Sequence, residues 1–341
     1  MNLAAEFGND AWQAELRKIA SLEDCQFPAN DEIKISGTRA QVAIKMTKKG
    51  LLTNMQTDAA AFEAWALTLL LHCGVQSIQI GLDADAADAE GRHYQRFLYR
   101  LKRFCDLFPG RVIATPPAAA PMALDMHIRR FLNKPNARKQ PPDTKSKERL
   151  LAASTADPSK ISESLLENAL EVSSAFSKRF RLDKWMRQWP VGLFKERVAD
   201  GCQIFSGGKS AIDLVGIRGD TLVLFELKNG DNRKAGAVSE LLFYASVMRD
   251  AIGDAPIFRF ESESAIKNCA VSPRDIVRCS NVCAVLLAPR FHPLISEPLM
   301  FAELNAAVAQ NYLLDRPIHF EAVQISLPRD QNDDFTFTPI H

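Results

Sequence analysis

The sequence lacks the grouped cysteines that mark disulfide frameworks and structural zinc sites. Its seven cysteines are scattered over 341 residues without a CxxC pair. Cys279 and Cys283 are the closest pair, with no matching second pair or nearby histidine. Because structural zinc needs grouped ligands, the pattern favours free thiols in a reducing, cytoplasmic setting.

Long apolar runs and a strong charge imbalance are missing as well. The longest apolar run, AWALTLLLHCGV, is too short to span a membrane, and the N-terminus has no basic region followed by an apolar core. We therefore expect no membrane partner. The net charge is only +1, so a nucleic-acid-binding surface would have to be local. The composition, 47% apolar and 24% charged, is that of a globular chain long enough for two domains.

The pattern predicts two α/β domains joined by a basic linker. Residues 1–132 alternate strand-like and helix-like segments and match no fold that we can assign. Residues 133–157, rich in Pro, Lys and Arg, predict a linker or mobile loop. Eight basic residues against two acids lie between Arg129 and Arg149, so a solvated hinge and a phosphate-tracking segment both stay open. Residues 158–341 make the second domain.

In the first domain, strands are predicted in EIKISG, QVAIKMT, VQSIQIGL and RVIAT. Asp58 is a candidate cap for a helix through AAAFEAWALTLLLHC. A second helix, from about Glu90 to Leu107, is read as amphipathic, although a nucleic-acid-facing helix stays open. Its apolar stripe leaves four arginines toward solvent, namely Arg92, Arg96, Arg100 and Arg103.

The second domain predicts the order α-β-β-β-α-β with additions. A helix begins at Ser159, a strand lies near GLFKERVA, a hairpin follows, and a helix runs from about Arg233 to Arg249. VCAVLLAP predicts a buried strand, and a helix from Glu297 to Val308 and a strand in HFEAVQISL complete the chain.

The hairpin, AIDLVGIRGDTLVLFELKNG over residues 211–230, carries charges inside apolar strands. Gly219-Asp220 suits a two-residue turn, which sets Arg218 opposite Thr221 and Asp213 opposite Glu226. Lys228 lies two residues beyond Glu226, on the same face. Two buried carboxylates need a cation, and a divalent metal with oxygen ligands is the natural candidate.

This motif, Asp213 followed by Glu226-Leu227-Lys228 at the end of the next strand, resembles that of the PD-(D/E)XK nuclease superfamily. The α-β-β-β-α-β order resembles that family's restriction-endonuclease-like core with a mixed sheet, over about residues 159–290. The resemblance implies a metal-dependent nuclease that hydrolyses phosphodiester bonds, in DNA more than RNA, in defence or repair. Double-strand cutters of this kind often pair two active sites, which favours a homodimer.

The residues themselves suit that chemistry. Asp213, Glu226 and the carbonyl of Leu227 are candidate ligands for Mg²⁺ or Mn²⁺. Lys228 is the candidate to hold the attacking water or to stabilise charge developing on the phosphorane. An ion pair that merely closes the hairpin end is the alternative for these side chains.

Further candidates come from the flanking segments. The family often places a metal-assisting Glu in its first helix, and Glu167, with Glu163 next, fits that place. Glu240 stands where relatives frequently carry Gln. Either acid could instead be an ordinary helix residue. Nucleic-acid contacts are predicted for Lys209 in GGKSAID, for Tyr244 one turn after Glu240, and for Trp185 and Arg187 in the basic-aromatic run 178–197.

Three alternatives stay open. Trp185 and Trp189 would, on another reading, be core residues that cap the sheet. In the second alternative, the protein keeps the nuclease fold but does not hydrolyse nucleic acid, and it binds or senses nucleic acid instead. A third reading makes the N-terminal region a specificity element that gates the nuclease.

Overall fold

The structure is a computed structural model that describes residues 7–19, 22, 27–55, 57–86, 91–115, 129–138, 142–156, 161–205, 210–229, 234–296, 298–311, 316–330 and 333–340. The chain divides into two compact units, and both are discontinuous in sequence. The first comprises Met1–His127, Lys234–Glu240 and His292–Tyr312, and the second comprises Ile128–Arg233, Leu241–Phe291 and Leu313–His341. This division differs from the predicted domains, because two later segments join the N-terminal unit.

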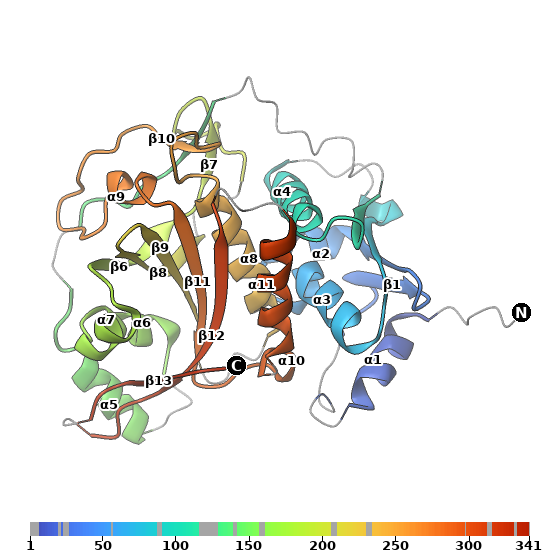
Figure 1. Cartoon of the computed structure of the whole chain (residues 1–341), viewed down its shortest axis with the longest axis horizontal. Helices are drawn as coiled ribbons and strands as arrows, with labels where there is room; N and C mark the ends of the chain where they lie inside the picture. Colours follow the sequence, from blue (N-terminus) through green and yellow to red (C-terminus); the bar gives the residue numbers. More distant parts are fainter. Residues whose placement is uncertain are drawn as a thin grey trace, which may run out of the picture. The chain divides into compact units, whose positions relative to one another are not determined.

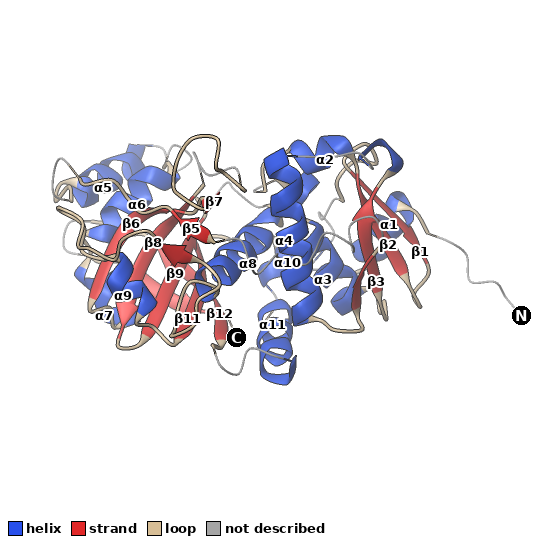
Figure 2. Ribbon diagram, turned by 90° about the horizontal axis from the view of Figure 1, so that it is seen from above, coloured by secondary structure: helices blue, strands red, loops and turns tan. Residues whose placement is uncertain are grey.

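The first unit is built on a four-stranded sheet of order β1-β2-β3-β4, of which Figure 2 labels β1, β2 and β3. Its strands are β1 (Ile33–Gly37), β2 (Val42–Met46), β3 (Ile78–Leu82) and β4 (Val112–Ala114). β1 pairs antiparallel with β2, while β2, β3 and β4 run parallel. All four strands lie in the segments where alternating apolar residues predicted them.

Helices α1 (Asn9–Arg17), α2 (Lys48–Leu52), α3 (Phe62–His72) and α4 (Gly91–Leu107) belong to this unit, as do α10 (Pro293–Ser296), α11 (Leu299–Asn311) and the short turns η2 (Asp58–Ala60) and η3 (Ala84–Ala86). The longest apolar run of the sequence forms α3, which is buried along most of its length. Over the residues that the structure describes, no helix has the length and apolar character needed to cross a membrane.

Arginines on α4 are buried, so the prediction that they face solvent is wrong for Arg96, Arg100 and Arg103, each at most 9% exposed. Arg100 shows the reason. Its Nε donates to Oε1 of Glu63 on α3 at 2.7 Å, and its guanidinium lies 4.7 Å from the centre of the Phe62 ring. A buried acid on another helix compensates the charge, and helical periodicity alone gives no sign of such a partner.

Asp58 caps a different helix from the one predicted. Its Oδ1 accepts a hydrogen bond from the backbone N–H of Ala235 at 2.8 Å, immediately before α8 (Gly236–Arg249). Burial raises the pKa of Asp58, and hydrogen bonds from the backbone of Ala235 and Gly236 partly oppose that rise.

We expect Asp58→Ala to lower the free energy of unfolding by about 1 kcal/mol, because the N-terminus of α8 loses its side-chain acceptor. Asp58→Asn keeps an acceptor and serves as the matched control, with a much smaller expected loss. Urea denaturation measures both variants. Equal losses in the two would assign the effect to the charge of Asp58 and not to the cap.

The second unit is built on a six-stranded mixed sheet of order β13-β12-β11-β9-β8-β6 (Figure 1). Strands β6 (Lys184–Pro190), β8 (Ala211–Arg218) and β9 (Thr221–Leu227) pair antiparallel. Strands β9, β11 (Asn281–Ala288) and β12 (Ile318–Ser326) run parallel, and β13 (Thr336–Pro339) is antiparallel to β12. A smaller sheet of order β10-β5-β7 contains β10 (Arg259–Phe260), β5 (Arg130–Leu132) and β7 (Leu193–Lys195).

Helices α5 (Ser146–Ala156), α6 (Glu163–Glu171) and α7 (Ser174–Phe180) lie on one face of the large sheet (Figure 1). The core between them includes Leu170 and Phe176 from the helices and Leu214, Val223 and Phe225 from the hairpin strands. Along the chain, α6 and α7 precede the large-sheet strands β6, β8 and β9, and α8 and then β11 follow them, within a mixed α/β architecture; β7 intervenes after β6, and β10 and α9 (Pro273–Val277) intervene before β11.

Three predictions of local structure in this unit are correct only in part. The first strand of the large sheet is β6, which lies in the basic-aromatic run, whereas the strand near GLFKERVA, β7, belongs to the small sheet. The predicted helix from Ser159 breaks after α6, and its residues 159 and 160 lie outside the described residues. The predicted linker contains α5, because Leu150 is fully buried in the core of this unit.

Candidate functional site

The hairpin of β8 and β9 has the predicted register. Arg218 pairs with Thr221, and regular pairing continues to Leu214 opposite Phe225. Gly219, the first residue of the turn, has a φ of +59°, a left-handed conformation that glycine adopts without strain. The turn thus fixes which residues of the two strands face each other.

Asp213 ends the regular pairing with a side-chain contact. Its Oδ2 accepts a hydrogen bond from the backbone N–H of Leu227 at 2.7 Å. Asp213 is half-buried. The contact places the Asp213 carboxylate beside the backbone that carries Glu226 and Lys228.

Glu226 and Lys228 form a buried ion pair at the end of β9. Their side chains are 2% and 3% exposed, and the Lys228 ammonium contacts Oε1 of Glu226. The Lys228 backbone is also fixed, since its N–H donates to the carbonyl of Leu287 on β11 at 3.0 Å. A buried pair of this kind needs close geometry to offset desolvation, so both groups are held in place.

These charges lie at one end of an otherwise apolar strand face. Val215, Ile217, Leu222 and Leu224, which share this face by strand alternation, are at most 7% exposed. The opposite face of the hairpin packs on α6 and α7. Both faces are therefore covered, and the low dielectric that results strengthens electrostatic interactions among the charged groups.

Glu167 on α6 is buried, at 4% exposure, and is held by β6. Its Oε2 accepts a hydrogen bond from Nε2 of Gln188 at 2.7 Å, and Nη1 of Arg187 lies 3.8 Å from the same oxygen. Burial raises the pKa of Glu167, while Gln188 and Arg187 act against the rise. In the β6–β8 register, Arg187 pairs with Leu214 and Trp189 pairs with Ile212. Gln188 therefore lies across from Asp213.

Because the folded-state pKa of Glu167 is raised above its ordinary value of 4.5, this carboxyl contributes stability that is fully present below that value. The contribution is lost as pH rises through the raised pKa. Glu167→Gln cannot titrate, so its free energy of unfolding relative to the wild type should increase as pH rises above the ordinary value of 4.5. Urea denaturation in EDTA measures this difference, and a difference that does not change with pH would contradict the assignment.

Three residues predicted to contact nucleic acid make contacts within the chain, and their role toward nucleic acid stays a prediction. The Trp185 Nε1 donates to the backbone carbonyl of Glu171 at 2.7 Å, and its ring packs against the core. Arg187 Nε lies 3.4 Å from Oε2 of Glu171. Tyr244 is 2% exposed, with its hydroxyl 3.1 Å from Oγ of Ser210. The Trp185 and Tyr244 contacts use the polar groups of those side chains within the fold, whereas the Arg187 side chain stays 31% exposed.

Trp189 is fully buried, which confirms the alternative that it belongs to the core. Lys209 lies outside the described residues. Glu240 is 2% exposed on α8, in the segment assigned to the first unit, and its role at the site stays a prediction.

The donor set at the hairpin end fits a hard divalent cation. Asp213 and Glu226 offer carboxylate oxygens from neighbouring strands, and Leu227 offers its carbonyl. Mg²⁺ is commonly held by one or two carboxylates together with waters and substrate phosphates. Within the described ranges, no three His, Cys, Asp or Glu side chains gather into a metal-binding group, so Glu163 and Glu167 do not join Asp213 and Glu226 in one.

Sequence reasoning missed Gln188 and its contact with Glu167. Gln188 has a φ of +59°, which interrupts β6 opposite Asp213. A single left-handed residue other than glycine leaves no mark in the apolar pattern.

Comparison of the chain with protein-family models, curated proteins and solved structures finds no match.

Proposed function

We propose that this protein is a metal-dependent nuclease that hydrolyses phosphodiester bonds, in DNA more than in RNA. The observation that carries the proposal is the contact between the Asp213 carboxylate and the Leu227 N–H, beside the buried Glu226–Lys228 pair. The helix-strand-strand-strand-helix-strand order of the mixed sheet supports a place in the PD-(D/E)XK nuclease superfamily.

Asp213, Glu226 and the Leu227 carbonyl would hold Mg²⁺ or Mn²⁺, which supplies an activated water and neutralises charge on the scissile phosphate when bound. The Leu227 N–H orients the Asp213 carboxylate. Glu226 holds the ammonium of Lys228 at the same end of the strand. From there, Lys228 either orients the attacking water or stabilises the charge that develops on the phosphorane.

The direct test is a cleavage assay with the purified full chain. Plasmid DNA, single-stranded DNA and RNA are incubated with Mg²⁺, with Mn²⁺ or with EDTA. We expect DNA to be cut with either metal and to stay intact in EDTA. Cleavage that persists in EDTA, or intact DNA with both metals, would refute the proposal.

The ion pair between Glu226 and Lys228 favours a second candidate function. Lys228 compensates the buried Glu226 charge within the chain, so the hairpin end can be stable without hydrolytic chemistry. The protein would then bind or sense nucleic acid. Calorimetry with Mn²⁺ separates the two functions, because salt-sensitive DNA binding without metal binding would favour the second.

A further inference from the structure

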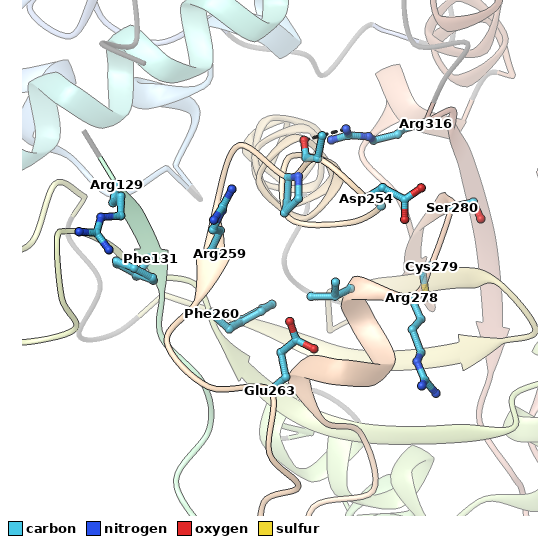
Figure 3. A pocket seen from close by; sticks show the side chains of 14 residues that line it. Arg129, Phe131, Asp254, Arg259, Phe260, Glu263, Arg278, Cys279, Ser280 and Arg316 are labelled. Carbon is cyan, nitrogen blue, oxygen red and sulfur yellow. Dashed lines mark hydrogen bonds between the residues drawn. The ribbon is translucent and has the colours of Figure 1, made fainter. Parts of the chain in front are cut away.

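A pocket of about 1040 Å³ opens in the second unit, near the start of β11 and β12 (Figure 3). It is separate from the Asp213 site. Along β9, Thr221 pairs with Asn281 at the start of β11, whereas Leu227 pairs with Leu287 near its end. At the rise of a β-strand, Cys279 and Ser280 of the lining therefore lie toward the end of β9 opposite Leu227, roughly 20 Å along the strand.

Positive charge dominates the lining of the pocket. Four arginines, namely Arg129, Arg259, Arg278 and Arg316, face two acids, Asp254 and Glu263. Figure 3 shows the Arg278 guanidinium pointing away from the other three, and guanidinium groups outnumber carboxylates even without it. Arg129 lies 3.7 Å from Glu196, an exposed pair that contributes little. The pocket therefore favours an anionic ligand.

A backbone hydrogen bond holds one arginine of the pocket, Arg316, in place. Nη2 of Arg316 donates to the backbone carbonyl of Ala255 at 2.9 Å. Gly253, with a φ of +78°, makes room, since a Cβ there would come within 3.2 Å of the Arg316 Nε. A cation whose position is fixed before binding loses little side-chain entropy when a ligand arrives.

A second arginine stands beside an aromatic ring. Arg259 on β10 and Phe131 on β5 are register partners on parallel strands, so their side chains share a face of the small sheet. Phe131 is half-buried and Arg259 is exposed. No ion pair or hydrogen bond of the Arg259 side chain is found within the described part of the chain. The pair therefore offers an aromatic face next to an uncompensated guanidinium.

We propose that this pocket binds a free nucleotide, with its phosphates on Arg259 and Arg316 and its base against Phe131. Guanidinium groups bind phosphate through paired, charge-assisted hydrogen bonds. Aromatic side chains stack on bases without regard to sequence. The volume of about 1040 Å³ is just above the range of about 300–1000 Å³ typical of small-ligand sites. The proposal is independent of the nuclease function.

The test is calorimetric titration of the full chain with ATP in EDTA, where cleavage by the proposed metal site does not enter. Arg259→Gln should weaken ATP binding by about tenfold, the effect of losing a charged hydrogen bond. The matched control is Arg274→Gln, which removes the same charge from α9 (Pro273–Val277) outside the pocket lining and should leave the affinity unchanged. Thermal unfolding of each variant checks that it is folded.

Phe131→Leu separates base stacking from phosphate binding. It should weaken ATP binding by about fivefold or more and leave inorganic pyrophosphate binding unchanged. Three results would overturn the proposal: ATP binding unaffected by Arg259→Gln, pyrophosphate bound as tightly as ATP, or a short oligothymidylate bound where ATP is not. The last would assign the pocket to a nucleic-acid strand. A chain without nuclease activity would still bind ATP, so failure of one proposal is distinguishable from failure of the other.

Discussion

Lys228→Met is expected to lower the rate of DNA cleavage by about 100- to 1000-fold, the cost of removing one group that stabilises transition-state charge. Lys228 is 3% exposed and is held against Glu226, so it cannot be replaced by bulk water or by a neighbouring cation without rearrangement. Methionine keeps most of the buried apolar stem and removes only the ammonium. Single-turnover cleavage of plasmid DNA with saturating Mn²⁺ measures the rate.

Removing Lys228 also leaves the Glu226 carboxylate buried without its partner, which is itself destabilising by about 3–5 kcal/mol. The double variant Lys228→Met with Glu226→Gln removes both charges and checks stability separately. Lys184→Met is the matched activity control. Lys184 lies on β6 of the same sheet, where it pairs with Asp275 at 49% exposure, and its loss should leave cleavage intact. A folded Lys228→Met protein that cuts at the wild-type rate would refute the role of Lys228.

Asp213→Asn is expected to weaken Mn²⁺ binding by about 10–100-fold or more. Loss of a residue that only supports a metal ligand already costs about that much in metal affinity. Asparagine keeps an oxygen that can accept the hydrogen bond from Leu227, so the hairpin end should keep its shape. It lacks the negative charge that a divalent ion requires. Titration calorimetry at neutral pH measures the affinity without reference to cleavage.

The control is Asp220→Asn, the same substitution at the other end of the same hairpin. The Asp220 carboxylate accepts a hydrogen bond from Asn281 at 3.1 Å and lies in the turn, so Mn²⁺ affinity should not change. Wild-type protein that binds no Mn²⁺, or equal affinity in Asp213→Asn, would remove the metal from the proposed mechanism. Salt-sensitive DNA binding in the same protein would then support the second candidate function.

The hairpin shows how far local information reaches. Gly219 and Asp220 fix the turn, the turn fixes the register, and strand alternation then assigns Asp213, Glu226 and Lys228 to one end. All of these steps involve residues close together in the chain. The same reasoning locates the strands of the first unit, because apolar alternation is a local pattern.

Long-range partners were beyond this reasoning. The helical pattern predicts that Arg100 faces solvent, but Glu63, 37 residues away in the sequence, neutralises its charge in the interior. Asp58 reads as the cap of the next helix, yet it binds the backbone of Ala235, 177 residues further on. Leu150, in an apparently polar linker, anchors α5 in the core. In each case the apolar pattern is correct, but the partner that decides the outcome lies on another element.

The sequence by itself determined the strands of the first unit, the hairpin register and the grouping of three charged residues, because turn chemistry and strand period act between near neighbours. Only the tertiary structure decided that Glu226 pairs with Lys228, that Gln188 holds Glu167, and that Arg259 and Phe131 meet in a pocket. The Gln188–Glu167 and Arg259–Phe131 contacts join separate elements, whereas Glu226 and Lys228 are near neighbours whose pairing the sequence left open as an alternative. The contacts between separate elements depend on how the strands are ordered in each sheet, which no local pattern specifies.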